Sequence, residues 1–93
     1  MKLKKLLNGV DVKNDISSIL DEEIEGLSNK FEEKHQNYLY FCYKGQEKDG
    51  HNLVDDTLLG SIKAIVVEKI IDTSIPQILV EDSRVAMSII ASN

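Results

Sequence analysis

The chain has 93 residues, of which 42% are apolar and 29% are charged. This balance is typical of a globular protein, and the length provides for one hydrophobic core and excludes two. The net charge of −5 gives no electrostatic footprint for nucleic acid or for an anionic membrane surface. A small anionic ligand is not excluded, because a few local donors can hold it.

The single cysteine and the first residues give information on the cellular compartment of the protein. Cys42 has no second cysteine to pair with, and its apolar neighbours favour a small buried hydrophobe over a reactive thiol. No segment approaches the roughly 20 apolar residues that span a bilayer. The basic start, residues 1–7, lacks the apolar stretch of a signal peptide. We therefore expect a cytoplasmic protein.

The first half of the chain predicts one short helix and two strands. Residues 3–10 carry leucine and valine at helical spacing, and Gly9 can supply a left-handed cap. A weak alternation predicts a strand at residues 23–27, followed by a polar loop at 28–37. Residues 38–43, Tyr-Leu-Tyr-Phe-Cys-Tyr, are rich in aromatic side chains and predict a central strand.

The second half continues with alternating elements. Residues 44–50 contain two glycines and predict a loop, and residues 51–59 predict a helix that Gly60 ends. Residues 62–67 form a β-branched run typical of a buried strand. A last strand is expected at residues 77–80, directly after a proline.

The final helix begins with a cap at Asp82 or Ser83 and continues to the last residue. Its apolar positions are Val85, Ala86, Ile89 and Ile90. Because it has no stop signal, we expect a fragment or a domain boundary there. The whole order predicts a small single α/β domain with a mixed, mostly parallel sheet flanked by helices.

The loop from Lys44 to His51 is the strongest candidate site. It joins a predicted strand to a predicted helix, its two glycines allow close approach of a ligand, and the helix start suits a phosphate or a uracil carbonyl. An ordinary strand-to-helix turn has the same features, and the residues alone favour that interpretation.

Other chemistry finds no support in the sequence. His35 and His51 lack partners at metal-ligand spacing, so no metal site is expected, and no catalytic residue is assigned. Three tyrosines at residues 38–43 could stack a base, although core packing explains them better. No glycine-rich loop ends in Gly-Lys-Ser or Gly-Lys-Thr, so the chain itself has no Walker-type ATP site.

Five short segments, in this order and spacing, resemble the amino-terminal domain of the UDP-N-acetylmuramoyl-tripeptide synthetases, which are Mur ligases. The segments are Gly26-Leu27-Ser28, then residues 37–45 (Asn-Tyr-Leu-Tyr-Phe-Cys-Tyr-Lys-Gly), Asp49-Gly50-His51, residues 62–68 (Ile-Lys-Ala-Ile-Val-Val-Glu) and residues 79–84 (Leu-Val-Glu-Asp-Ser-Arg). The resemblance covers nearly the whole chain.

The resemblance implies that residues 1–93 form a nucleotide-recognition domain, which grips the uridine end of a UDP-N-acetylmuramoyl-peptide in peptidoglycan synthesis. Central and C-terminal ligase domains would follow and use ATP and Mg to form an amide, so this chain alone should hold no cofactor and be inactive. The family's second uridine loop maps here to Gly45, Gln46, Glu47, Lys48 and Asp49.

At the position of the family's first uridine loop, this sequence departs from the family pattern. Its Asp-Ser-Arg positions read Lys30-Phe31-Glu32 here. In the family pattern the serine hydroxyl would hydrogen-bond the nucleotide, and losing this bond costs about 1–3 kcal/mol. The loss would be offset if Phe31 stacks on the nucleotide while Ser28 and Asn29 supply polar contacts. The alternative is a degenerate module of the same fold that binds no nucleotide and acts in protein interaction or regulation.

Overall fold

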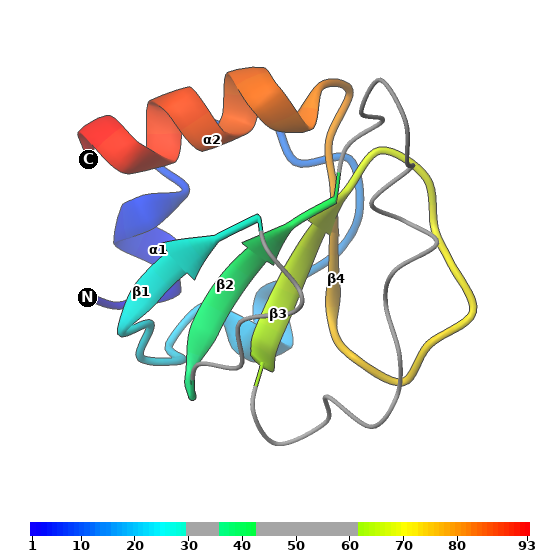
Figure 1. Cartoon of the computed structure of the whole chain (residues 1–93), viewed down its shortest axis with the longest axis horizontal. Helices are drawn as coiled ribbons and strands as arrows, with labels where there is room; N and C mark the ends of the chain where they lie inside the picture. The colour runs from blue at the N-terminus through cyan, green and yellow to red at the C-terminus, as the bar shows by residue number, and fades with distance from the viewer. Residues whose placement is uncertain (30–35, 43–61) are drawn as a thin grey trace.

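In the computed structural model of the chain, the residues described are 1–29, 36–42 and 62–93. The predicted loop at 44–50, the predicted helix at 51–59 and most of the predicted loop at 28–37 lie outside them. The elements are α1 (Leu3–Leu6), the 3-10 helix η1 (Ser17–Ile19), β1 (Gly26–Ser28), β2 (Tyr38–Phe41), β3 (Ile62–Val67), β4 (Gln77–Leu79) and α2 (Ser83–Ser92) (Figure 1).

The four strands form one sheet in the order β1-β2-β3-β4, and every pairing among them is parallel. The predicted α/β class is therefore confirmed, with an all-parallel sheet where we expected a mixed or mostly parallel one. Helices α1 and α2 lie together over one face of the sheet (Figure 1).

The predicted and observed strand bounds agree best for β3, which is rich in β-branched residues. β3 has the predicted bounds, and β2 and β4 begin as predicted but end earlier. β1 begins at Gly26 rather than at Glu23, because residues 22–24 instead pair with the start of the chain. Lys2 and Glu23 form an antiparallel bridge, and the Ile24 amide donates to the Met1 carbonyl at 2.9 Å. Ser28, expected in a loop, therefore ends a strand.

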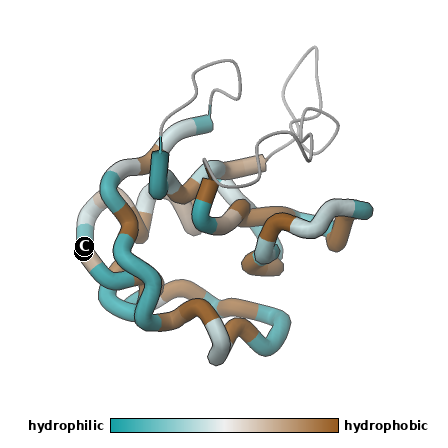
Figure 2. Tube along the Cα trace, turned by 90° about the horizontal axis from the view of Figure 1, so that it is seen from below, coloured by the Kyte–Doolittle hydropathy of each residue, from teal (hydrophilic) through white to brown (hydrophobic). Residues whose placement is uncertain are grey.

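Alternate residues of the strands build two apolar layers, one on each face of the sheet. Figure 2 shows the hydrophobic stretches along the trace in brown. Leu39, Phe41 and Val66 face α1 and α2, whereas Tyr40 and Cys42 face the other way with Ile65 and Val67. Tyr40 and Cys42 are both buried. The interpretation of these two side chains as core residues is confirmed.

Helix α2 is capped by Asp82, whose carboxylate accepts from the amides of Arg84 and Val85. Ala86 and Ile90 enter the core as the sequence indicates, but Val85 is 55% exposed. Each residue turns about 100° around a helix, so a face that buries Ala86 and Ile90 places Val85 on its flank.

The outer edge of β4 is covered by residues 13–14. The Lys13 amide donates to the Leu79 carbonyl at 2.7 Å. The Asn14 carboxamide donates to the Gln77 carbonyl at 2.8 Å and accepts from the Leu79 amide at 2.9 Å. This side chain thus occupies the hydrogen-bonding position of a neighbouring strand and shields an edge that would otherwise invite pairing.

Candidate functional site at the carboxyl edge of the sheet

Because all four strands are parallel, their carboxyl ends meet at one edge of the sheet (Figure 1). Open parallel sheets bind ligands in the loops outside this edge. Ser28, the last residue of β1, is in register with Tyr40 near the end of β2. The chain therefore leaves β1 and β2 side by side, and these are the starting points of the two loops that the sequence singled out.

The structure describes the predicted site only in part. Ser28 and Asn29 are half-buried at the carboxyl end of β1. The other predicted residues lie outside the described part of the chain; they are Phe31, Gly45, Gln46, Glu47, Lys48 and Asp49. Their assignment therefore stays a prediction.

The amino terminus of α2 stands at the same edge but is closed by the protein's own carboxylates. The Glu68 carboxylate accepts from the Ser83 amide at 2.8 Å, and Asp82 accepts from the next two amides. These groups already neutralise the positive end of the helix dipole, which would otherwise attract a phosphate. Sequence reasoning missed the contribution of Glu68, although an acid directly after a buried strand is a usable signal.

Ser83 also lies at this helix start. It is completely buried, and its Oγ atom has no hydrogen-bond partner in the described structure. Such an orphaned hydroxyl costs about 1–3 kcal/mol. A ligand cannot reach it without displacing its neighbours.

Tyr40 offers no ring for nucleobase stacking, and Tyr43 lies outside the described residues. The rings of Tyr38 and Tyr40 pack against each other, with centroids 6.2 Å apart and planes 44° apart. Tyr40 is 1% exposed, so it presents no face to a base. Within residues 1–29, 36–42 and 62–93, no three His, Cys, Asp or Glu side chains gather as metal ligands.

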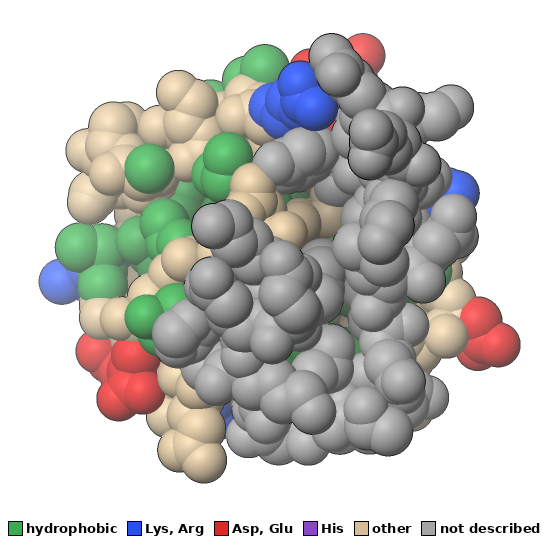
Figure 3. Space-filling model, in the orientation of Figure 1, with side chains coloured by type: hydrophobic (Ala, Val, Ile, Leu, Met, Phe, Trp, Pro, Cys, Tyr) green, Lys and Arg blue, Asp and Glu red, His purple; other side chains and the backbone are tan. Residues whose placement is uncertain are grey.

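Two acids that precede β1 in the sequence have lowered pKa values. The Ser17 backbone amide lowers the pKa of Asp15, and the amino-terminal NH3⁺ lowers the pKa of Glu23; both acids precede β1. Figure 3 shows acidic side chains at separate places on one face. In the part of the chain that the structure describes, no helix is long and apolar enough to cross a membrane.

Comparison of the sequence with known proteins finds relatives that carry the same enzyme name. No family model matches the chain. It is 36% identical over 73 residues to the UDP-N-acetylmuramoyl-L-alanyl-D-glutamate--2,6-diaminopimelate ligase of Aquifex aeolicus, covering 78% of this chain and 15% of the relative. The ligase of the same name from Listeria innocua is 31% identical over 91 residues, covering 98% of this chain and 18% of the relative. The chain thus spans under a fifth of the length of these two enzymes.

Solved structures agree on the fold. MurF from Acinetobacter baumannii superposes with a TM-score of 0.81 at 23% identity, over 95% of this chain and 19% of MurF. A second structure, titled as a UDP-N-acetylmuramoylalanyl-D-glutamyl-2,6-diaminopimelate--D-alanyl-D-alanyl ligase from the same organism, gives 0.79 at 23% identity, over 95% and 20%. Together with the sequence relatives, this likeness shows that the chain belongs to the Mur ligase family and corresponds to the amino-terminal domain of these enzymes.

Proposed function

We propose that this domain binds the uridine end of a UDP-N-acetylmuramoyl-peptide for an ATP-dependent ligase of peptidoglycan synthesis. The names of the Aquifex and Listeria relatives include such a UDP-linked precursor. The observation that carries the proposal is the parallel register of β1 and β2, which starts both candidate loops at one edge. Amide formation would need central and C-terminal domains with ATP and Mg, and the protein would act in the cytoplasm.

The occupied amides at the start of α2 favour a site at the carboxyl ends of β1 and β2 over one at α2. The first amides of α2 already donate to Glu68 and Asp82 and are therefore not available to a nucleotide. Ser28 and Asn29 carry polar side chains at the end of β1. In this proposal they contact the uridine together with residues 45–49, and Phe31 stacks beside it.

Isothermal titration with UDP-N-acetylmuramoyl-dipeptide tests the proposal on the folded chain. We expect binding that Ser28→Ala weakens about fivefold or more, because one hydrogen bond to a ligand contributes about 1 kcal/mol. Ser18→Ala is the matched control, since Ser18 is an exposed serine in η1, before β1. Absence of heat at millimolar ligand, with folding verified by circular dichroism, would contradict the proposal.

The substitution at residue 31 separates the proposed function from its alternative. Phe31→Ser restores the hydroxyl that the family pattern carries, so UDP affinity should change by a factor of several if this position faces the nucleotide. If UDP binds neither variant and a protein partner requires Phe31, the domain is instead an interaction module of the same fold.

A further inference from the structure

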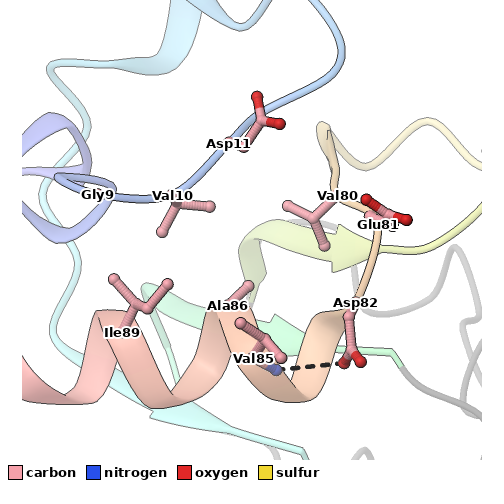
Figure 4. A pocket seen from close by; sticks show the side chains of 9 residues that line it. All are labelled: Gly9, Val10, Asp11, Val80, Glu81, Asp82, Val85, Ala86 and Ile89. Atoms are coloured by element: carbon pink, nitrogen blue, oxygen red, sulfur yellow. Dashed lines mark hydrogen bonds between the residues drawn. The ribbon is translucent and has the colours of Figure 1, made fainter.

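A groove on the helical face has no role in the proposed nucleotide site. It lies between α2 and the chain that follows α1, and has a volume of about 570 Å³. Its apolar lining comes from three segments: Val10, Val80 and, on α2, Val85, Ala86 and Ile89. Figure 4 shows Val10 and Ile89 pointing toward each other across the groove, with Ala86 and Val80 to the right of them. We call it the α2 groove.

The apolar lining includes a side chain that the core does not use. Val85 is 55% exposed although it belongs to an otherwise well-packed helix. Val85 and Ile89 stand one helical turn apart and form a short stripe along the flank of α2. Paired apolar side chains at this spacing beside a hollow are typical of a surface that receives another chain.

The two ends of the α2 groove differ in charge. Gly9 and Ile89 form the uncharged end, and a Cβ atom added to Gly9 would come within 3.4 Å of the Ile89 side chain. The other end carries three carboxylates, those of Asp11, Glu81 and Asp82 (Figure 4). Lys13 binds Asp11 at 2.7 Å and offsets one of these charges, which leaves a net negative end.

We propose that the α2 groove docks a protein segment that places branched apolar side chains on Val85 and Ile89 and a Lys or Arg at the Glu81 end. The acidic end disfavours phosphate-bearing ligands. A purely apolar occupant would desolvate carboxylates without a partner, at a net cost. A second copy of the chain is disfavoured because each copy carries a net charge of −5.

A designed peptide serves as the probe, in a fluorescence-anisotropy titration of the full chain. The probe is a labelled amphipathic helix of about 14 residues, built from Leu and Lys. A peptide with Glu in place of Lys is its charge control. Val85→Ser and Glu81→Gln test the groove. Ile70→Ser and Asp72→Asn are matched controls, because both residues are exposed and lie in the β3–β4 connection.

The Leu/Lys probe should bind, Val85→Ser should weaken it about fivefold and Glu81→Gln about threefold. Ile70→Ser, Asp72→Asn and an excess of UDP should change nothing. Equal binding to all variants would mean general attraction to an acidic protein and would overturn the proposal, as would no binding at millimolar peptide. Sedimentation showing a dimer that Val85→Ser dissolves would assign the groove to a second copy instead.

Discussion

At Gly26 the outer end of the Tyr38 ring occupies the space that a side chain would take. A Cβ atom there would lie 2.3 Å from Cζ and 2.7 Å from the hydroxyl of Tyr38. The Tyr38 ring is in turn held against Tyr40. The glycine that opens the first family-like segment therefore has a packing reason, independent of any nucleotide.

Gly26→Ala should lower the free energy of unfolding by about 1–2 kcal/mol, because the half-buried ring must leave Tyr40 to make room. Urea denaturation measures the loss. In a Tyr38→Leu background the same substitution should cost almost nothing, since the ring is gone. Equal costs in both backgrounds would show that the ring is not what excludes a side chain.

Glu23 gives the chain a pH-dependent contact at its start. Its carboxylate accepts from the Met1 amino group at 2.8 Å, which lowers the pKa of Glu23 from its ordinary 4.5. A carboxyl group with a lowered pKa in the folded state stabilises above the unfolded value and loses this effect as the pH falls. Because the pair is exposed, the contribution is small and sensitive to salt.

We therefore expect Glu23→Gln to reduce stability at pH 7 and to have a smaller effect at about pH 3, because protonation of the carboxylate weakens the contact as the pH falls. Urea denaturation midpoints at the two pH values, with and without added salt, measure the difference in stability between the variant and the original chain. Asp72→Asn is a control for the loss of one exposed acid. A larger effect of Glu23→Gln at the acidic value would have the wrong sign for this contact.

At the scale of elements, the edge of β4 depends on one side chain. Asn14 bonds both the Gln77 carbonyl and the Leu79 amide, so it replaces two contacts of a missing strand. Asn14→Ala should cost about 1–3 kcal/mol by leaving these two backbone groups without protein partners. Asn8→Ala, at an exposed asparagine in the same part of the chain, is the control. Equal losses in the two variants would contradict a special role for residue 14.

The elements also show how far sequence reasoning reaches. β3 was predictable with its bounds, because four of its six residues are β-branched and favour a strand. β1 was not, because its start depends on pairing with Met1 and Lys2 far away in the sequence. Val85 illustrates the same limit: helical spacing marks apolar positions, but the partners packed around α2 decide which are buried.

For the whole molecule, the alternation of predicted strands and helices predicted the α/β class, and the order of short sequence segments predicted the family. The candidate site was predicted as two loops, of whose residues the structure describes Ser28, at the end of β1, and the adjacent Asn29. Side chains in loops depend on tertiary contacts that no local pattern fixes. The contact of Glu68 with the Ser83 amide is of the same kind, although the acid directly after β3 is visible in the sequence.

Chemical-shift mapping of the ¹⁵N-labelled chain with UDP is the most direct test of the nucleotide site. If the uridine binds outside the carboxyl ends of β1 and β2, the amides of Ser28, Asn29 and Cys42 should shift in a saturable way. Those of Ser18 and Val85 should stay in place. Saturable shifts centred on Val85 and the α2 groove, or no shifts at millimolar UDP, would contradict this account.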